Sequence, residues 1–129
     1  MKIEKIFVYL QYYQVEVSIN HHQGIKRVIN KVLLKDNVPI MPYKDYMEYA
    51  RYNKVQIATK DELLQMYLQK NEINKILKEH NGNTLAFDWF GSSSEHHSYS
   101  VWAIHFDSGC STSVFKDISY LSRAVVGLK

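Results

Sequence analysis

Phe90-Gly91-Ser92-Ser93-Ser94-Glu95 is followed by Val101-Trp102-Ala103-Ile104-His105-Phe106, then by Asp107-Ser108-Gly109, Lys116 and Ser122-Arg123-Ala124-Val125. A serine-rich run thus precedes a strand with large apolar residues, a turn and a returning strand. This order predicts a meander of strands. It indicates the architecture of the chain more strongly than any particular chemistry.

The segments around this stretch have the pattern of β structure. Apolar and polar residues alternate at 85–87, and Trp102, Ile104 and Phe106 share one face of a strand. The turn at 107–109 is followed by a returning strand that contains residues 114–115. A final strand is predicted at 120–126.

Two helices are predicted before this region. Thr59 and Glu62 have the spacing of a capping box, which predicts a helix over 60–69. A second helix is predicted over 72–80, with Asn81-Gly82 as its stop signal. The buried stripe of the first helix is predicted to consist of Leu63, Leu64, Tyr67 and Leu68.

The N-terminal part predicts strands over 6–10 and 15–19, because apolar residues alternate with more polar ones. A turn is predicted at 20–24. The segment 25–34 has a mixed period that we interpret as a strand, with a short helix as the alternative.

Two prolines then decide where the next helix can begin. Pro39 and Pro42 require an extended or turning chain at 36–42. An amphipathic helix is predicted over 43–53, with Tyr43, Tyr46, Met47 and Ala50 on one face.

The composition predicts a single domain over residues 1–129. Apolar residues make up 46% and charged residues 22%, which are ordinary values for a globular protein. The one cysteine, Cys110, favours a reducing compartment. The N-terminal apolar run is interrupted by charges, and no window has the roughly 20 apolar residues of a membrane span. A cytoplasmic location is therefore expected, and export would require a partner or a leader removed from this sequence.

Strands, helices and then a meander of strands predict an α+β fold whose first and last strands pair. From residue 56 to residue 127 the chain resembles a bacterial family of domains of unknown function in the C-type-lectin-like superfamily. The matching residues are Thr59, Glu62, Leu63, Ser92, Ser93, Ser94, Glu95, Trp102, Phe106, Ser108, Gly109, Lys116, Arg123 and Val125.

The resemblance implies a C-type-lectin-like mixed fold, with two or three helices packed on antiparallel strands and the N- and C-terminal strands paired. It also implies that ligand contacts come from the long loop and the strands after it. Relatives of this fold include carbohydrate-binding lectins, adhesin tips and an oxidase that makes formylglycine. The chain has neither the Glu-Pro-Asn, Gln-Pro-Asp and Trp-Asn-Asp motifs of a sugar-binding Ca²⁺ site nor a pair of cysteines, so no cofactor is expected.

The candidate ligand-binding residues lie on the predicted loop 88–100. Aromatic and histidine side chains among small serines are the composition of a recognition surface. The chain is therefore expected to be a non-enzymatic module that binds a protein or a glycan. The proposed residues are Trp89, Glu95, His96, His97 and Tyr99.

Some aromatic and basic residues of this region have a structural interpretation. Burial at the base of the loop is the alternative for Trp89 and Phe90. Trp102 and Phe106 are assigned to core packing, and Arg123 to a structural salt bridge or hydrogen bond.

Other functions remain as alternatives. The basic segment 26–35 holds Lys26, Arg27, Lys31 and Lys35 in a chain of formal net charge +3, and could contact nucleic acid or phosphate. We favour a solvated face for it. The tyrosines at 43–52 could instead form a homomeric interface.

Two further alternatives involve the histidine pairs. His21-His22 and His96-His97 could supply metal ligands if the fold brings the pairs together, with Glu95 adding an oxygen. Neighbouring histidines on a strand point to opposite faces, so each pair would normally give only one ligand, and a metal site around His96 is kept as an alternative. Ser92, Glu95 and His96 are the residue types of a hydrolase, but the glycines of a nucleophile elbow are missing.

Overall fold

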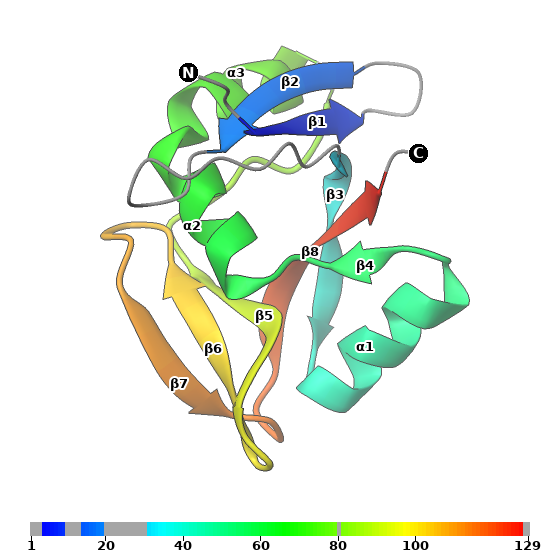
Figure 1. The fold of residues 1–129 in the computed structure, drawn as a ribbon, viewed down its shortest axis with the longest axis vertical. Coiled ribbons are helices and arrows are strands. Elements are labelled where there is room, and N and C mark those ends of the chain that lie inside the picture. The colour runs from blue at the N-terminus through cyan, green and yellow to red at the C-terminus, as the bar shows by residue number, and fades with distance from the viewer. Residues whose placement is uncertain (1–3, 10–13, 20–30, 80, 128–129) are drawn as a thin grey trace.

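The computed structural model describes residues 4–9, 14–19, 31–79 and 81–127. Within them the chain forms three helices and eight strands (Figure 1). In chain order these are β1 (Glu4–Tyr9), β2 (Gln14–Ile19), β3 (Lys31–Met41), α1 (Tyr43–Tyr52), β4 (Gln56–Ile57), α2 (Lys60–Leu68), α3 (Lys70–Glu79), β5 (Trp89–His97), β6 (Ser100–His105), β7 (Ser111–Phe115) and β8 (Tyr120–Gly127). The predicted α+β class is confirmed.

The strands form one mixed sheet in the order β2-β1-β3-β8-β5-β6-β7, and β4 adds to β8. The prediction that the first and last strands pair is wrong, because β3 lies between β1 and β8. β3 has eleven residues and buries Leu33 and Val38 completely, so it takes an interior position with a partner on each edge. The expectation of antiparallel strands also fails in part, since β1 pairs with β3, and β5 with β8, in parallel.

The helices cover different parts of this sheet (Figure 1). α1 packs against β3 and β4, whereas α2 packs against β2, β5 and β6. Two cores result. The larger contains Leu33, Ala58, Leu63, Met66, Ile73, Leu77, Leu85, Phe90, Ile104, Phe106 and Val125. The smaller, under α1, contains Val38, Tyr46, Ala50, Ile57 and Ala124.

The predicted starts of α1 and α2 are confirmed, whereas α3 begins at Lys70, two residues before the predicted start at 72. Pro42 is extended and its carbonyl accepts the backbone N–H of Tyr46 at 3.0 Å, so α1 begins directly after the prolines. At α2, both hydrogen bonds of the capping box between Thr59 and Glu62 are present. The predicted buried stripe is wrong at one position: Leu68 is 70% exposed and Met66 is buried in its place.

Two predictions about extended segments are corrected. No strand forms at 85–87, because the side chain of Asn74 satisfies both backbone groups of Leu85, accepting its N–H at 2.6 Å and donating to its carbonyl at 3.3 Å. The segment 88–100, expected to be a long loop, contains β5 and the turn that joins it to β6. The segment 20–30, with the predicted turn and the start of the predicted strand 25–34, lies outside the described residues.

Arg123 lies in β8 and is completely buried. Its guanidinium donates to the carbonyls of Leu34 and Asn83, each at 2.9 Å, and to Oδ1 of Asn37 at 2.7 Å. Burial lowers the pKa of Arg123 to about 10, and the charge of Asp36 acts in the opposite direction. The prediction of a structural role for Arg123 is therefore confirmed.

None of the helices within the described residues has both the length and the apolar character that crossing a bilayer requires.

Candidate functional site

The serine-rich run forms an irregular strand whose hydroxyl groups hold its shape. β5 pairs regularly with β6 from Trp89 to Gly91, and the register then shifts twice before His97. At the first shift, the Ser92 hydroxyl donates to the carbonyl of Trp102 at 2.6 Å and accepts the N–H of Ser94 at 3.0 Å. The serines therefore replace the backbone bonds that the bulge removes.

This part of β5 is also attached to the start of α2. The backbone N–H of Ser93 donates to the carbonyl of Ala58 at 3.0 Å. The backbone N–H of Lys60 donates to the hydroxyl of Ser94 at 2.9 Å. The strand that carries the predicted binding residues is thus fixed by a helix as well as by the sheet.

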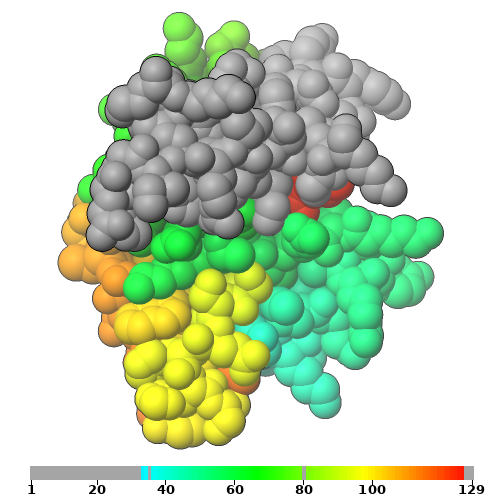
Figure 2. Space-filling model, in the orientation of Figure 1, coloured from blue at the N-terminus to red at the C-terminus, as the bar shows by residue number. Residues whose placement is uncertain are grey.

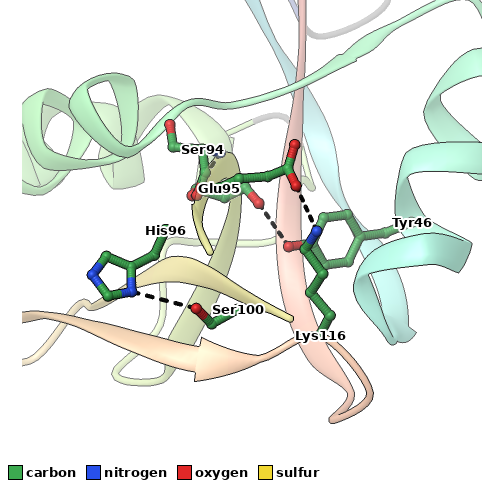
Figure 3. Close-up of polar contacts among 7 residues, drawn as sticks. Tyr46, Ser94, Glu95, His96, Ser100 and Lys116 are labelled. Atoms are coloured by element: carbon green, nitrogen blue, oxygen red, sulfur yellow. Dashed lines mark hydrogen bonds and ion pairs between the residues drawn. The ribbon is translucent and has the colours of Figure 1, made fainter. Parts of the chain in front are cut away.

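Tyr46 fixes β5 from the side of α1 (Figure 3). Its buried hydroxyl donates to the carbonyl of Ser92 at 2.7 Å, and burial raises the pKa of this phenol far above its usual 10.0. The ring lies so close to Gly91 that a Cβ there would be 2.8 Å from the hydroxyl oxygen. Only glycine fits at this contact without displacing the ring.

Beyond the bulge, five rings follow one another across the end of the hairpin. The centroid of His96 lies 4.6 Å from that of Trp102 and 4.1 Å from that of His97. His97 stacks on Tyr99 at 5.5 Å with an interplanar angle of 17°, and Tyr99 lies 6.1 Å from Phe115 of β7. We call Trp102, His96, His97, Tyr99 and Phe115 the ring row.

The ring row reaches the surface. Tyr99 is 60% and Phe115 57% exposed, both histidines are exposed, and Trp102 is half-buried. Figure 2 shows the end of the β5–β6 hairpin, in yellow, at the foot of the molecule. Exposed aromatic side chains that contact one another form a continuous surface rather than isolated apolar groups.

A charged group lies beside the ring row, and an ion pair lies on the opposite face of the hairpin. The ammonium of Lys60 stands 4.1 Å from the ring centroid of Trp102, which is a cation–π contact. Glu95 forms an ion pair of 2.5 Å with Lys116, whose ammonium also lies 4.7 Å from the ring centroid of Tyr43 (Figure 3). Burial and the Glu95 carboxylate raise the pKa of Tyr43, and Lys116 opposes this shift.

His96 is oriented by its own hydrogen bond. Its Nδ1 lies 3.3 Å from the hydroxyl of Ser100, a buried residue at the start of β6 (Figure 3). This contact holds the imidazole between Trp102 and His97. The middle of the ring row is therefore positioned by the hairpin itself.

Of the five residues proposed from the sequence, the structure brings His96, His97 and Tyr99 together in the ring row. Glu95 points away from His96, toward Lys116 (Figure 3). Trp89 is not in the ring row either. It lies at the opposite end of β5, where its half-buried ring meets His105 at 4.7 Å. Phe90 is buried in the large core, as the alternative for it predicted.

Sequence reasoning missed Lys60 and Phe115 at the ring row, and it assigned Trp102 to the core. Phe106 is in the core, but Trp102 is half-exposed beneath Lys60. The sequence pattern was misleading for Trp102, because this residue shares a strand face with Ile104 and Phe106, which are both buried. The signal for Phe115 depends on its pairing with Ser100, a register that the sequence does not specify.

The hydrolase alternative finds no support in this geometry. The Ser92 hydroxyl is buried and bonded to a backbone carbonyl, and His96 contacts Ser100 instead. In the part of the chain that the structure describes, no three His, Cys, Asp or Glu side chains gather into a possible metal site. His21, His22, Lys26 and Arg27 lie outside the described residues.

A second concave surface lies between α1, β4 and β5. It has a volume of ≈ 420 Å³, is open to solvent and is mainly apolar. Its lining consists of Met47, Ala50, Arg51, Val55, Gln56, Ile57, Thr59 and Ser93. Its lining residues include no aromatic ring and one charged side chain, that of Arg51, so the ring row is the stronger candidate for recognition.

A comparison of the chain with protein-family models finds no match, and a search among curated proteins finds none.

Proposed function

We propose that the chain is a non-enzymatic binding module that recognises a protein or a glycan through the ring row. The observation that carries this proposal is the unbroken series of ring contacts from Trp102 to Phe115 at the surface. Rings in contact present a wide apolar area, and each has only two side-chain torsions to order on binding.

The scaffold beneath the ring row supports the proposal. The bulge serines, Tyr46 and the start of α2 hold β5 by hydrogen bonds in the unbound chain. A surface that is ordered before binding loses less conformational entropy when the ligand arrives. The residues thus have the rigidity that a recognition surface requires.

The charges suggest what the ligand must offer. The ammonium of Lys60 brings a donor to the edge of the ring row, and the imidazoles of His96 and His97 add ring nitrogens to it. A sugar ring has one apolar face and a rim of hydroxyl groups, which fits this combination. A partner protein would fit by placing an apolar side chain on the rings and an acceptor beside Lys60.

The C-type-lectin-like fold implied by the resemblance is part of this proposal, and three helices on a mixed sheet support it. A cytoplasmic location is proposed as well, supported by the exposed thiol of Cys110. The tyrosine alternative loses support, because Tyr46 is buried and Tyr43 and Tyr49 are half-buried.

The test is binding of the purified protein to a panel of glycans and proteins at two salt concentrations. The variant is His97→Ala/Tyr99→Ala, and the matched control is Tyr52→Ala, an exposed tyrosine at the far end of α1. We expect a ligand whose binding tolerates salt and weakens about tenfold or more in the double variant, as loss of a binding hot spot does. The control should bind like the wild type.

Competition separates the two ligand classes. A free oligosaccharide added in excess should displace a bound glycan, whereas it should leave a bound protein in place. Binding that falls steeply with salt and is unchanged in the double variant would contradict the proposal and favour the basic segment 26–35.

A further inference from the structure

β7 is an edge strand without the usual protection. It ends the strand order, and within the described residues nothing pairs with its outer side. Its sequence, Ser-Thr-Ser-Val-Phe, contains no charge and no proline, and its register with β6 has no bulge. Natural edge strands usually carry one of these devices to prevent pairing with another chain.

The direction of its backbone groups follows from the ladder with β6. The N–H of His105 donates to the carbonyl of Cys110 at 2.9 Å, and the N–H of Lys116 donates to the carbonyl of Tyr99 at 2.9 Å. Hydrogen-bonded and non-hydrogen-bonded pairs alternate in an antiparallel ladder. Cys110 and Lys116 face β6, so Thr112 and Val114 between them do too. The alternate residues Ser111, Ser113 and Phe115 therefore direct both their N–H and their C=O groups away from β6.

We propose that β7 pairs antiparallel with β7 of a second copy of this chain, with Ser113 opposite Ser113 of the partner subunit. In this register Ser111 lies opposite Phe115 of the partner subunit. The three outward N–H groups and three outward C=O groups of each copy then form hydrogen bonds with the other copy across a two-fold axis. A register centred on either end of the strand would leave some of these groups unpaired.

The side chains also suit a second copy. Ser113 is small, so the two strands can approach at the axis without a clash. Phe115 of each copy lies beside Ser111 of the partner subunit, which gives the exposed ring a neighbour. The absence of charge in β7 means that two identical strands meet without repulsion between them.

The dimer places both ring rows on the same side of the joined sheet, because a two-fold axis perpendicular to a sheet keeps each face on its own side. Two sites on one side can engage a repeated ligand at the same time. Five-residue strands bury less area than stable interfaces do, so the association is weak and depends on concentration. The dimer does not depend on the ligand, so it can be tested separately from the proposed function.

Disulfide trapping tests the register. In a Cys110→Ser background, Ser113→Cys places two thiols on residues whose Cα atoms are about 5.5 Å apart across the axis, within the range of a disulfide. Thr112→Cys in the same background is the matched control, since two residues of offset separate its Cα atoms by roughly 8 Å. We expect mild oxidation to give a covalent dimer from Ser113→Cys only. Crosslinking of both variants to the same extent, or of neither, would overturn the proposal.

Sedimentation velocity from micromolar to millimolar protein tests the association without a crosslink. We expect the wild type to self-associate, and Ser113→Lys or Ser113→Glu alone to do so about tenfold more weakly, because like charges meet at the axis. An equal mixture of the two variants should associate again. Asn71→Lys, at an exposed position of α3, is the control for net charge and should behave like the wild type. A monomeric wild type, or a Ser113→Lys variant that associates normally, would refute the dimer.

Discussion

The two ends of the β5–β6 hairpin use aromatic residues in opposite ways. At the inner end, Phe90 is completely buried and its ring lies 4.9 Å from that of Phe106 in the large core. At the outer end, the rings of His97 and Tyr99 contact each other and solvent. The same strand therefore carries a part of the core and a candidate binding surface.

The neighbours of each end explain this difference. α2 and α3 place Leu63, Met66 and Leu77 in the core that Phe90 enters. At the outer end of the hairpin, α2 covers the sheet only as far as its first residue, Lys60, whose ammonium lies over Trp102. Exposure is decided by how far the helix extends over the sheet and not by the kind of side chain.

The largest expected effect is a difference in stability between variants at the inner and the outer end of the β5–β6 hairpin. Phe90→Ala should lower the free energy of unfolding by about 3–5 kcal/mol, because it leaves a cavity among packed side chains. Tyr99→Ala should change it by no more than about 0.5 kcal/mol, since the ring is mostly exposed. Urea unfolding followed by tryptophan fluorescence measures both. Equal losses in the two variants would show that the ends do not differ in this way.

A smaller effect is expected at the glycine contact with α1. Gly91→Ala should cost about 1–3 kcal/mol, because the new Cβ meets the hydroxyl of Tyr46. Tyr46→Phe removes that oxygen and should itself cost about 1–3 kcal/mol, since the Ser92 carbonyl loses its partner.

The double variant Gly91→Ala/Tyr46→Phe sharpens this prediction. Its loss should be smaller than the sum of the two single losses, as urea unfolding of all four proteins would show. Strict additivity would mean that the hydroxyl does not limit the space at residue 91.

The smallest effect is a dependence on pH. Burial holds the pKa of Tyr46 well above 10.0 in the folded chain, so at alkaline pH the phenol ionises first in the unfolded chain. Its contribution to stability is complete below pH 10 and is lost as the pH rises toward the folded pKa. The stability difference between the wild type and Tyr46→Phe should therefore shrink above pH 10 in urea unfolding series. A difference that stays constant with pH would contradict the raised pKa.

Local signals in the sequence predicted local structure. The capping box of Thr59 and Glu62 fixed the start of α2, and the prolines fixed the start of α1, because these effects act within one helical turn. The order of the strands could not be predicted in the same way. Whether β3 lies between β1 and β8 depends on pairing between distant segments, and alternation shows only which side of a strand is buried.

The candidate site was predicted in part for a related reason. His96, His97 and Tyr99 are close in sequence, so their clustering followed from a short segment. Phe115 joins them only through the register of β7 with β6, and Lys60 only through the packing of α2. Trp89 lies apart from these residues because the nine residues of β5 are extended, whereas a loop would have let the two ends of the segment approach each other.

The central position of β8 has a consequence for how the chain folds. Arg123 of this strand bonds to Leu34, 89 positions earlier, and the strand joins β3, β4 and β5. The ribosome synthesises those three strands first, so the edges that they present to β8 stay unpaired until residues 120–127 have been made. Such long-range contacts slow folding and leave strand edges open to aggregation meanwhile. The growing chain is therefore most vulnerable in the interval before β8 is complete.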